Sequence, residues 1–505
     1  MTYDTIVVGA GIGGLFAAAR LVRAGRSVLV LEKLPHIGGT SYIFRRGGYF
    51  FPMGPLSFSH PARVESFLRD VDIEPGIEFK RNHFQLVTPA LDVIYSRPLE
   101  SLRNDLQSAF PVEQRGLDRF FSELGGWIRD LKDIETWHPD FRLPSEPSNF
   151  SAAAEEEILG RRERIPSWSA IPVRELLDEV IADPNLKNLL GSQGTGPPVM
   201  SALNLAFMWR AMSDVGIWFP SNGLHGLCRM LASSVAFGGG KIMTSTPVGR
   251  ILVESGRAVG VKTADGEIFT GQWIVSNADY KKTFLELIDP VLVPPEHLDL
   301  VRNVPYTGSE LCVYLGIDPA RVDFRRMRAE HLFYRKEIRP QSDSPPEDFD
   351  NREIEICRWS ENAPDSVPRG RASLILRVDF PHKEIAAWRT GEKARRAGYR
   401  ETKNRLAWKL IRTVENVLPG LSSAVEVLET ATPLTYQDWG QRTEGSIAGW
   451  TWSADAAAGL PGKFLIETLI GNLLTAGIYA AKELFLGGVP TAMHTGAYAA
   501  DLILR

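Results

Sequence analysis

A glycine pattern within the first fourteen residues limits the fold more than any other feature. Gly9, Gly11 and Gly14 have the spacing GxGxxG. An apolar run at residues 5–8 predicts a buried parallel strand before them, and a helix is predicted from residue 15 to 24. In such a turn the first glycine permits the bend, the second lets the backbone approach a pyrophosphate, and the third lets the helix pack against the strand. The sequence therefore predicts a dinucleotide-binding unit at this end of the chain.

An acidic residue at the expected distance supports this interpretation. A second predicted strand, residues 27–31, is followed directly by Glu32, eighteen residues after Gly14. A carboxylate at this place accepts hydrogen bonds from a ribose in dinucleotide-binding folds. A lone GxGxxG would be weak evidence in a chain with 45 glycines. Here strand, glycines, helix, second strand and acid agree, so they outweigh the alternative of a glycine-rich turn that binds nothing.

Size and charge exclude several classes of protein. A chain of 505 residues is too long for one core, so two or more domains are expected. The 57 basic and 61 acidic residues give a net charge of −4, so we expect no nucleic-acid partner. Cys228, Cys312 and Cys357 are too widely spaced for a disulfide framework or a metal cluster. We therefore predict no metal site and a reducing compartment.

The same features predict a cytoplasmic location. No signal peptide is expected, because the first strand begins almost at Met1, and no run of roughly twenty apolar residues is present to span a bilayer. Residues 161–168 and 325–328 are short basic runs. They are interpreted either as solvated faces or as contacts to anionic lipid, which would place the protein peripherally on the inner face of the membrane.

Two further glycine-rich stretches carry a family resemblance. Residues 38–41 contain a glycine pair that lets the backbone run close beside a ligand, and residues 47–55 (GGYFFPMGP) predict a strand entering a tight loop. The order GxGxxG, acid, GG and this loop resembles the FAD-dependent amine-oxidase superfamily. Residues 432–450, with TPLT followed by GSIAGW, resemble its branch of phytoene desaturases, carotenoid cis–trans isomerases and retinol saturases. The resemblance implies FAD as the cofactor.

The resemblance covers nearly the whole chain and implies an α/β fold with two discontinuous domains. Residues 1–70, 215–290 and 460–505 are expected to form a Rossmann-like FAD-binding domain, a parallel sheet with a β-meander crossover. Residues 71–214 and 291–459 are expected to form an α+β substrate domain. Its first part is predicted to be helical, and its aromatic residues are interpreted as core packing, with a long apolar substrate tunnel as the functional alternative.

The C-terminal residues are predicted to close the cofactor site. Residues 473–477 predict a strand that ends in glycine, and residues 487–490 (GGVP) lead into a helix that runs to Ile503. Its dipole would stabilise negative charge on the N1–C2=O edge of a reduced flavin. Many relatives have a polar residue where this chain has Ile478, so only a backbone contact to the ribityl chain is expected there.

The predicted cofactor contacts come from both ends of the chain and from its middle. In the resemblance, the residue matching Val248 offers its backbone to the adenine. The full predicted set is Gly9, Ala10, Gly11, Ile12, Gly13, Gly14, Glu32, Lys33, Gly39, Thr40, Ser41, Met53, Gly54, Val248, Asn277, Gly477, Ile478, Gly488, Val489, Pro490 and Met493.

No catalytic residue is assigned. A polyene has no polar handle, so its site needs mainly apolar walls and the exclusion of water. Candidates are Arg45, His60, Glu444 and Trp450, each better explained as a structural or solvated residue than as a catalytic one. His494 in the last helix is interpreted as a packed histidine.

The resemblance implies an FAD-dependent oxidoreductase of an apolar polyene, which is a carotenoid, a retinoid or a related isoprenoid lipid. Desaturation, saturation and cis–trans isomerisation through hydride transfer at flavin N5 stay open. A second GxGxxG in a strand–helix context is absent from the sequence. The electron partner is therefore expected to be a quinone, oxygen or a diffusing reductant rather than a nicotinamide held in its own domain.

Two other interpretations remain. A flavin amine or amino-acid oxidase of the same superfamily would need a polar substrate anchor. A non-catalytic prenyl-binding protein resembling the GDP-dissociation inhibitors would share the fold without the flavin. The intact GxGxxG and Glu32 argue against the second, because a degenerate site has no need of them.

Overall fold

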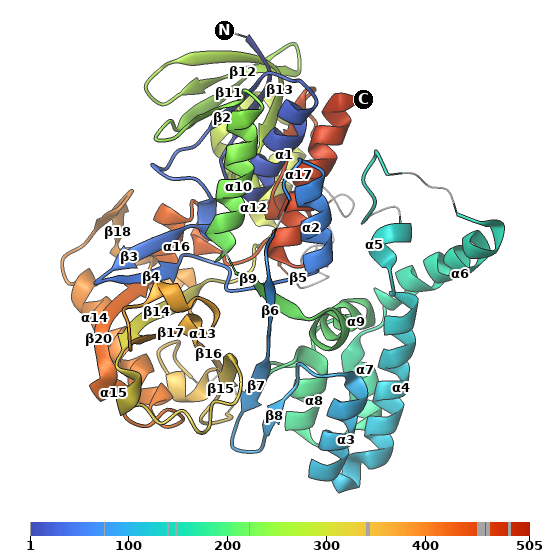
Figure 1. Ribbon diagram of the computed structural model, residues 1–505, viewed down its shortest axis with the longest axis vertical. Helices are drawn as coiled ribbons and strands as arrows, with labels where there is room; N and C mark the ends of the chain where they lie inside the picture. The colour runs from blue at the N-terminus through green and yellow to red at the C-terminus, as the bar shows by residue number, and fades with distance from the viewer. Residues whose placement is uncertain are drawn as a thin grey trace.

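The computed structural model describes residues 2–74, 76–138, 141–146, 150–221, 223–339, 344–451, 460, 465–482 and 486–505. Two large sheets organise these residues, one above the other in Figure 1. The two ends of the chain lie at the same end of the molecule, beside β11–β13. The N-terminal and C-terminal segments therefore belong to one sheet, as the predicted cofactor site requires.

The first sheet has the order β10-β2-β1-β13. Both β21 and β12 pair with the remaining edge of β13, and β11 pairs with β12. β10, β2, β1, β13 and β21 are parallel, and β11–β13 form an antiparallel meander. This confirms the predicted parallel sheet with its meander. The strands are β1 (Thr2–Val8), β2 (Val28–Leu31), β10 (Lys241–Met243), β11 (Val248–Glu254), β12 (Arg257–Thr263), β13 (Ile268–Ser276) and β21 (Leu473–Thr475).

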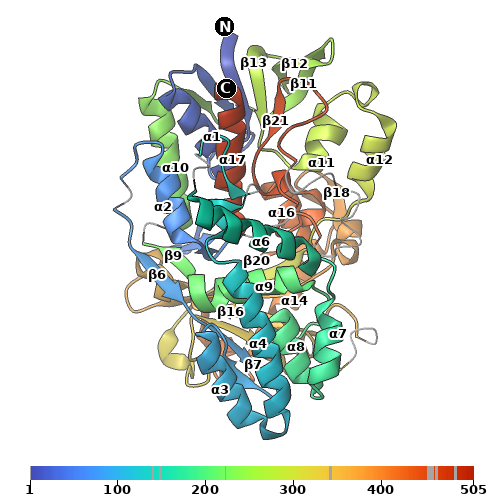
Figure 2. The same ribbon diagram turned by 90° about the vertical axis from the view of Figure 1, so that its right-hand side faces the viewer.

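Both faces of this sheet are buried, as expected for parallel strands. Val7 of β1 packs in the core on one face, and its neighbours Ile6 and Val8 pack in the core on the other. The face of Val7 is covered by α1 (Ile12–Arg23), α10 (Gly223–Phe237) and α17 (Gly488–Leu504). The other face carries α11 (Tyr280–Lys282) and α12 (Pro295–Asn303). Figure 2 shows α17 close to α1 and β21 beside β13.

The second sheet has the order β20-β14-β17-β16-β15-β7-β8. Its neighbouring strands are antiparallel except for the parallel pair β15 and β7. The prediction that the first part of the substrate domain, residues 71–214, is helical is wrong in part, because β6, β7 and β8 lie within it. The strands are β7 (Phe84–Val87), β8 (Asp92–Ile94), β14 (Glu310–Ile317), β15 (His331–Tyr334), β16 (Ile354–Cys357), β17 (Ala372–Asp379) and β20 (Val425–Ala431).

Helices cover this second sheet and extend away from it. α14 spans Tyr399–Val414 and packs in the core of the sheet. The predicted aromatic residues of the helical part share one buried core: Phe120, Phe121, Trp127, Trp137 and Phe141. This confirms core packing for them. The helices are α3 (Leu99–Ala109), α4 (Gln114–Asp130), α5 (Ile134–Trp137), α6 (Ala152–Trp168), α7 (Val173–Val180), α8 (Pro184–Ser192) and α9 (Ala202–Arg210).

Short elements connect the two sheets. One small sheet, β5-β9-β6, lies between them in Figure 1, and the hairpins β3–β4 and β18–β19 lie at one side. Among the described helices, none combines the length and the apolar character that a bilayer crossing requires. The elements are β3 (Ile43–Arg46), β4 (Tyr49–Pro52), β5 (Phe58–Ser59), α2 (Pro61–Arg69), β6 (Phe79–Asn82), β9 (Ile217–Pro220), α13 (Trp359–Asn362), β18 (Arg389–Gly391), β19 (Ala394–Arg395), α15 (Leu421–Ala424) and α16 (Pro433–Trp439).

Candidate functional site

A cavity of about 260 Å³ lies at the carboxyl ends of the parallel strands β1, β2, β13 and β21. This is the edge at which open α/β sheets bind ligands. The cavity, hereafter the dinucleotide cavity, brings together predicted residues from both ends and the middle of the chain: Gly9, Gly11, Ile12, Gly13, Glu32, Lys33, Gly39, Thr40, Ser41, Val248, Asn277, Gly477 and Ile478.

Its glycines leave space in the cavity that β-carbons would occupy. A β-carbon added at Gly11 would lie 2.7 Å from Asn277 Nδ2, and one at Gly13 would lie 2.7 Å from the carbonyl oxygen of Ala492. A β-carbon at Gly477 would lie 2.7 Å from Asn277 Oδ1. No side chain caps the start of α1, which leaves the helix N-terminus facing the cavity. Both features suit a pyrophosphate, which needs backbone N–H groups and close backbone approach.

Glu32 is held rigidly at the end of β2. The backbone N–H of Ala10 donates to Glu32 Oε2 at 2.7 Å, and that of Leu34 donates to Glu32 Oε1 at 2.8 Å. Burial raises the pKa of the Glu32 carboxyl, and the hydrogen bonds from Leu34 and Ala10 oppose that rise. Each carboxylate oxygen can accept more than one hydrogen bond. The residue therefore has acceptor capacity left for ribose hydroxyls.

Some cavity residues were not singled out from the sequence. Arg442 donates from Nη2 to Thr40 Oγ1 at 2.8 Å, and Asp279 accepts a hydrogen bond from the backbone N–H of Thr443 at 2.7 Å. These contacts join segments far apart in the chain, so no local sequence pattern predicts them. Others in this group are Ala278, Lys282, Glu286, Trp439, Gln441, Tyr479 and Ala492.

Other predicted residues lie outside the cavity wall. Gly14 packs behind the turn, since a β-carbon there would lie 2.3 Å from the carbonyl oxygen of Gly9. A β-carbon on Gly54 would lie 2.7 Å from the carbonyl oxygen of Thr40, and Met53 lines a neighbouring cavity. Ala10 itself does not line the cavity, but its backbone N–H donates to Glu32, which does. Gly488, Val489, Pro490 and Met493 lie in the first two turns of α17, and their cofactor contacts stay predictions.

The neighbouring cavity, of about 510 Å³, shares Trp439 with the dinucleotide cavity. It lies against the hairpin β3–β4, strand β20 and helix α16. Six aromatic rings line it: Tyr42, Phe44, Tyr314, Tyr399, Tyr436 and Trp439. We call it the aromatic cavity.

A buried polar network holds the Gly54 loop against the second sheet. Arg377 donates to the carbonyl oxygen of Gly54 and lies 3.5 Å from Glu310 and 3.8 Å from Glu355. Tyr436 donates its hydroxyl to Glu310 at 2.6 Å. Burial raises the pKa of Glu310, and Arg377 and Tyr436 oppose that rise. The network positions a loop that the sequence analysis assigned to the cofactor, and its members are scattered over several elements, so no motif reveals it.

The candidate catalytic residues are placed as follows. His60 is buried in a left-handed backbone conformation (φ 58°). Burial lowers its pKa to about 4. Arg45 and Glu444 are exposed. Trp450 is buried and donates Nε1–H to the carbonyl oxygen of Tyr479 at 3.0 Å. His494 is buried in α17, and burial lowers its pKa to about 3.

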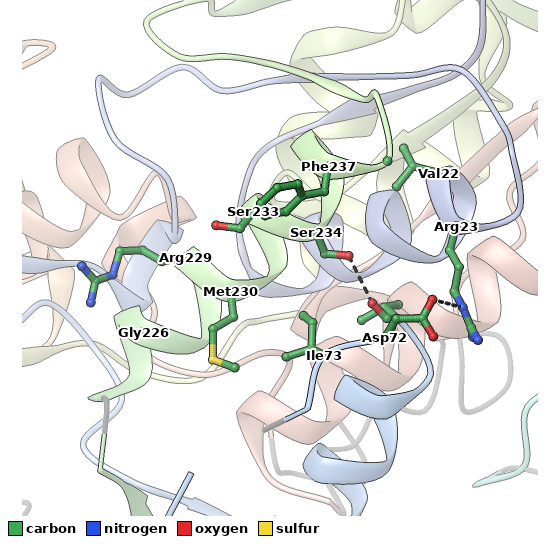
Figure 3. A pocket seen from close by; sticks show the side chains of 12 residues that line it. Val22, Arg23, Asp72, Ile73, Gly226, Arg229, Met230, Ser233, Ser234 and Phe237 are labelled. Atoms are coloured by element: carbon green, nitrogen blue, oxygen red, sulfur yellow. Dashed lines mark hydrogen bonds and ion pairs between the residues drawn. The ribbon is translucent and has the colours of Figure 1, made fainter. Parts of the chain in front are cut away.

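A further hollow, of about 880 Å³, lies elsewhere, on the outer face between α1, α10 and the chain after α2 (Figure 3). An ion pair of 2.7 Å joins Arg23 and Asp72 at its edge, and Phe237 is almost fully exposed. It contains none of the predicted cofactor residues. We therefore place the candidate site in the dinucleotide cavity.

Both basic runs make ion pairs within the chain. In α6, Arg164 pairs with Asp130 at 2.9 Å. In the other run, Arg325 pairs with Asp323 at 2.5 Å and Arg328 pairs with Asp92. These pairs reduce the positive charge available to an anionic lipid, which favours the interpretation of solvated faces.

The fold and the dinucleotide cavity are those of a flavin-dependent oxidoreductase. The chain belongs to the family of flavin containing amine oxidoreductases, whose family model matches residues 12–504. Its cofactor is FAD.

Several named proteins are similar to this chain in sequence. The chain is 26% identical to prolycopene isomerase 1 of an Oncidium hybrid cultivar over 462 residues, covering 88% of this chain and 75% of the relative. It is 24% identical to the all-trans-retinol 13,14-reductase of Danio rerio (98% and 84% covered). It is 25% identical to the zeta-carotene-forming phytoene desaturase of Myxococcus xanthus (86% and 81% covered).

Solved structures share the fold. An oxidoreductase from Methanosarcina mazei superposes with a TM-score of 0.58 at 17% identity, covering 98% of this chain and 99% of that one.

Proposed function

We propose that this protein is an FAD-dependent oxidoreductase of a polyene, which is a carotenoid, a retinoid or a related isoprenoid lipid. The observation that carries the proposal is the aromatic cavity, which shares Trp439 with the dinucleotide cavity. Rings that line a pocket suit a long conjugated chain. Three relatives are named for reactions of such compounds.

The residues of this chain hold and orient the cofactor. We infer that Gly11 and Gly13 hold the pyrophosphate, that Glu32 accepts from the ribose, and that the backbone at Val248 contacts the adenine. The N-terminus of α17 would face the flavin edge, where the helix dipole favours negative charge. When bound, the flavin supplies hydride transfer, and the protein positions the substrate and excludes water.

The division into domains is also proposed. Residues 1–70, 215–290 and 460–505 would form the FAD-binding domain, and residues 71–214 and 291–459 the substrate domain. Support comes from the two sheets, since the strands of the first lie within the former ranges and those of the second within the latter. The electron partner would be a quinone, oxygen or a diffusing reductant. Cytoplasmic location and peripheral membrane contact stay predictions.

The test is product analysis with the purified holoprotein. Phytoene, a cis-carotene and retinol are each incubated with the oxidised and with the reduced holoprotein, and the products are separated by chromatography. A desaturated, isomerised or saturated product supports the proposal and names the reaction. Conversion of small amines with peroxide release, and of no polyene, would contradict it.

A further inference from the structure

The aromatic cavity carries positive charge as well as rings. Four cations line it, Arg46, Lys393, Arg395 and Lys403, together with two carboxylates, Glu429 and Asp438. A cavity built for a hydrocarbon would gain nothing from these cations and would have to desolvate them. The charge therefore says something about the ligand that the rings alone do not.

Asp438 is already shared between cations. It is buried at the end of α16 and pairs with Arg395 at 2.5 Å and with Arg389. The backbone N–H of Lys393 donates to the same carboxylate at 2.9 Å. These contacts fix the turn between β18 and β19 over the cavity, and they leave one carboxylate facing two guanidinium groups.

Glu429 is shared in the same way. It pairs with Arg46 at 2.9 Å and lies 3.7 Å from Lys403. Each of the two carboxylates is shared between two cations, so the residues that line the cavity carry an excess of positive charge.

Lys393 has the position that suits a ligand best. Its Nζ lies 4.2 Å from the ring centroid of Trp439, the residue that the two cavities share. In the described part of the chain it makes no ion pair with a carboxylate, and its side chain is exposed at the tip of the turn. Burial lowers the pKa of His36, another lining residue, and the charge of Lys393 lowers it further, so His36 is neutral and adds no charge at pH 7.

We propose that the aromatic cavity binds an isoprenoid polyene with an anionic head group, a carboxylate or a phosphate. The head group lies beside Lys393 and Arg395, and the chain extends along the rings toward Trp439 and the dinucleotide cavity. The volume of about 510 Å³ lies within the usual size of ligand pockets, about 300–1,000 Å³. This inference rests on the proposed function, because it names the class of polyene that the site would take.

The test is an equilibrium binding titration of the holoprotein, in which the quenching of tryptophan fluorescence reports binding. All-trans-retinoic acid and geranylgeranyl phosphate are the two anionic probes, and all-trans-retinol is the neutral one. Variants are Lys393→Gln, Lys393→Arg and the control Lys241→Gln, whose lysine is exposed on edge strand β10 and lines neither cavity. Lys393 is exposed, so its replacement leaves the core intact.

We expect at least one anionic probe to bind about tenfold more tightly than retinol, and the tighter of the two identifies the head group. Lys393→Gln should weaken that probe about fivefold and change retinol less than twofold, as expected for one partly exposed charge pair. Lys393→Arg should restore binding, and Lys241→Gln should have no effect. Retinol binding as tightly as both anions, an unchanged affinity in Lys393→Gln, or no binding of either anion would overturn the inference.

Product analysis separates this result from the proposed function. Turnover of neutral polyenes with weak binding of the anions contradicts the inference and leaves the proposed function intact. Tight binding of an anion without conversion of any polyene contradicts the proposed function and supports the inferred site.

Discussion

Gly496 of α17 lies directly against the carbonyl oxygen of Gly13 in α1, and a β-carbon at position 496 would lie 2.2 Å from that oxygen. The contact joins the last helix of the chain to the first. Gly13 itself lines the dinucleotide cavity. The close approach of these two helices thus helps to shape the wall of the dinucleotide cavity.

Gly496→Ala is therefore expected to push α1 and α17 apart. We predict a loss of about 2 kcal/mol in the free energy of unfolding, the usual cost of overpacking, together with a lower content of bound flavin. Urea unfolding and the flavin-to-protein absorbance ratio measure the two effects. The matched control is Gly160→Ala in α6, where the nearest atom would lie 3.6 Å away. It should be stabilising by about 0.5–1 kcal/mol. Equal stabilities of the two variants would contradict the prediction.

Glu32→Gln should weaken FAD binding. An amide has one acceptor oxygen, whereas both oxygens of Glu32 already accept from backbone N–H groups. We expect the dissociation constant for FAD to rise about tenfold, measured by fluorescence titration of the apoprotein. Glu254→Gln, at an exposed residue that ends β11, should leave it unchanged. An unaltered affinity in Glu32→Gln would mean that the carboxylate does not contact the ribose.

Stability should depend on pH through His60. Its folded-state pKa of about 4 lies below the ordinary value of 6.5, because burial disfavours the charged imidazole. Between these two pH values the unfolded chain binds more protons than the folded chain. The stabilisation that comes from the neutral His60 is therefore fully present above pH 6.5 and is lost as the pH drops toward 4. Glu135 raises this pKa and Arg210 lowers it. The full contribution is about 3 kcal/mol.

His60→Asn tests this dependence, because asparagine tolerates the left-handed backbone at this position. Thermal melts from pH 7 to pH 4 should show a shallower fall for the variant than for the wild type. Part of the fall should remain, since His494 also has a lowered pKa. Parallel curves would show that the pKa of His60 is the same in the folded and the unfolded chain, which would contradict the prediction.

The network around Arg377 should be essential for stability. Arg377→Met leaves the buried Glu310 and the half-buried Glu355 without their shared cation, and we predict a loss of about 3–5 kcal/mol in urea unfolding. The double variant Glu310→Gln/Arg377→Met should recover at least about 1 kcal/mol. Arg325→Met, at an 89% exposed side chain, should change stability by less than about 0.5 kcal/mol. A double variant no more stable than Arg377→Met would show that Glu310 is not coupled to this cation.

The parts of the fold that local sequence encodes were the parts that could be predicted. β1, α1 and Glu32 follow one another within a short stretch, so spacing alone predicts their arrangement. The parallel pairing of β7 with β15 joins segments more than 200 residues apart, and the chain between them gives no local sign of it. The same reason explains why Arg377 and Arg442 were missed. Their partners, Gly54 and Thr40, lie near the other end of the chain.

The central claim is that FAD, held between both ends of the chain, exchanges a hydride with a polyene. The most direct test is anaerobic mixing of the holoprotein with retinoid and carotenoid probes, with simultaneous recording of the flavin absorbance spectrum and of the products. The account predicts that the flavin band changes in step with a change in the double bonds of a polyene. A flavin that responds to small amines and to no polyene, or a purified protein that neither contains flavin nor takes up added FAD, would contradict it.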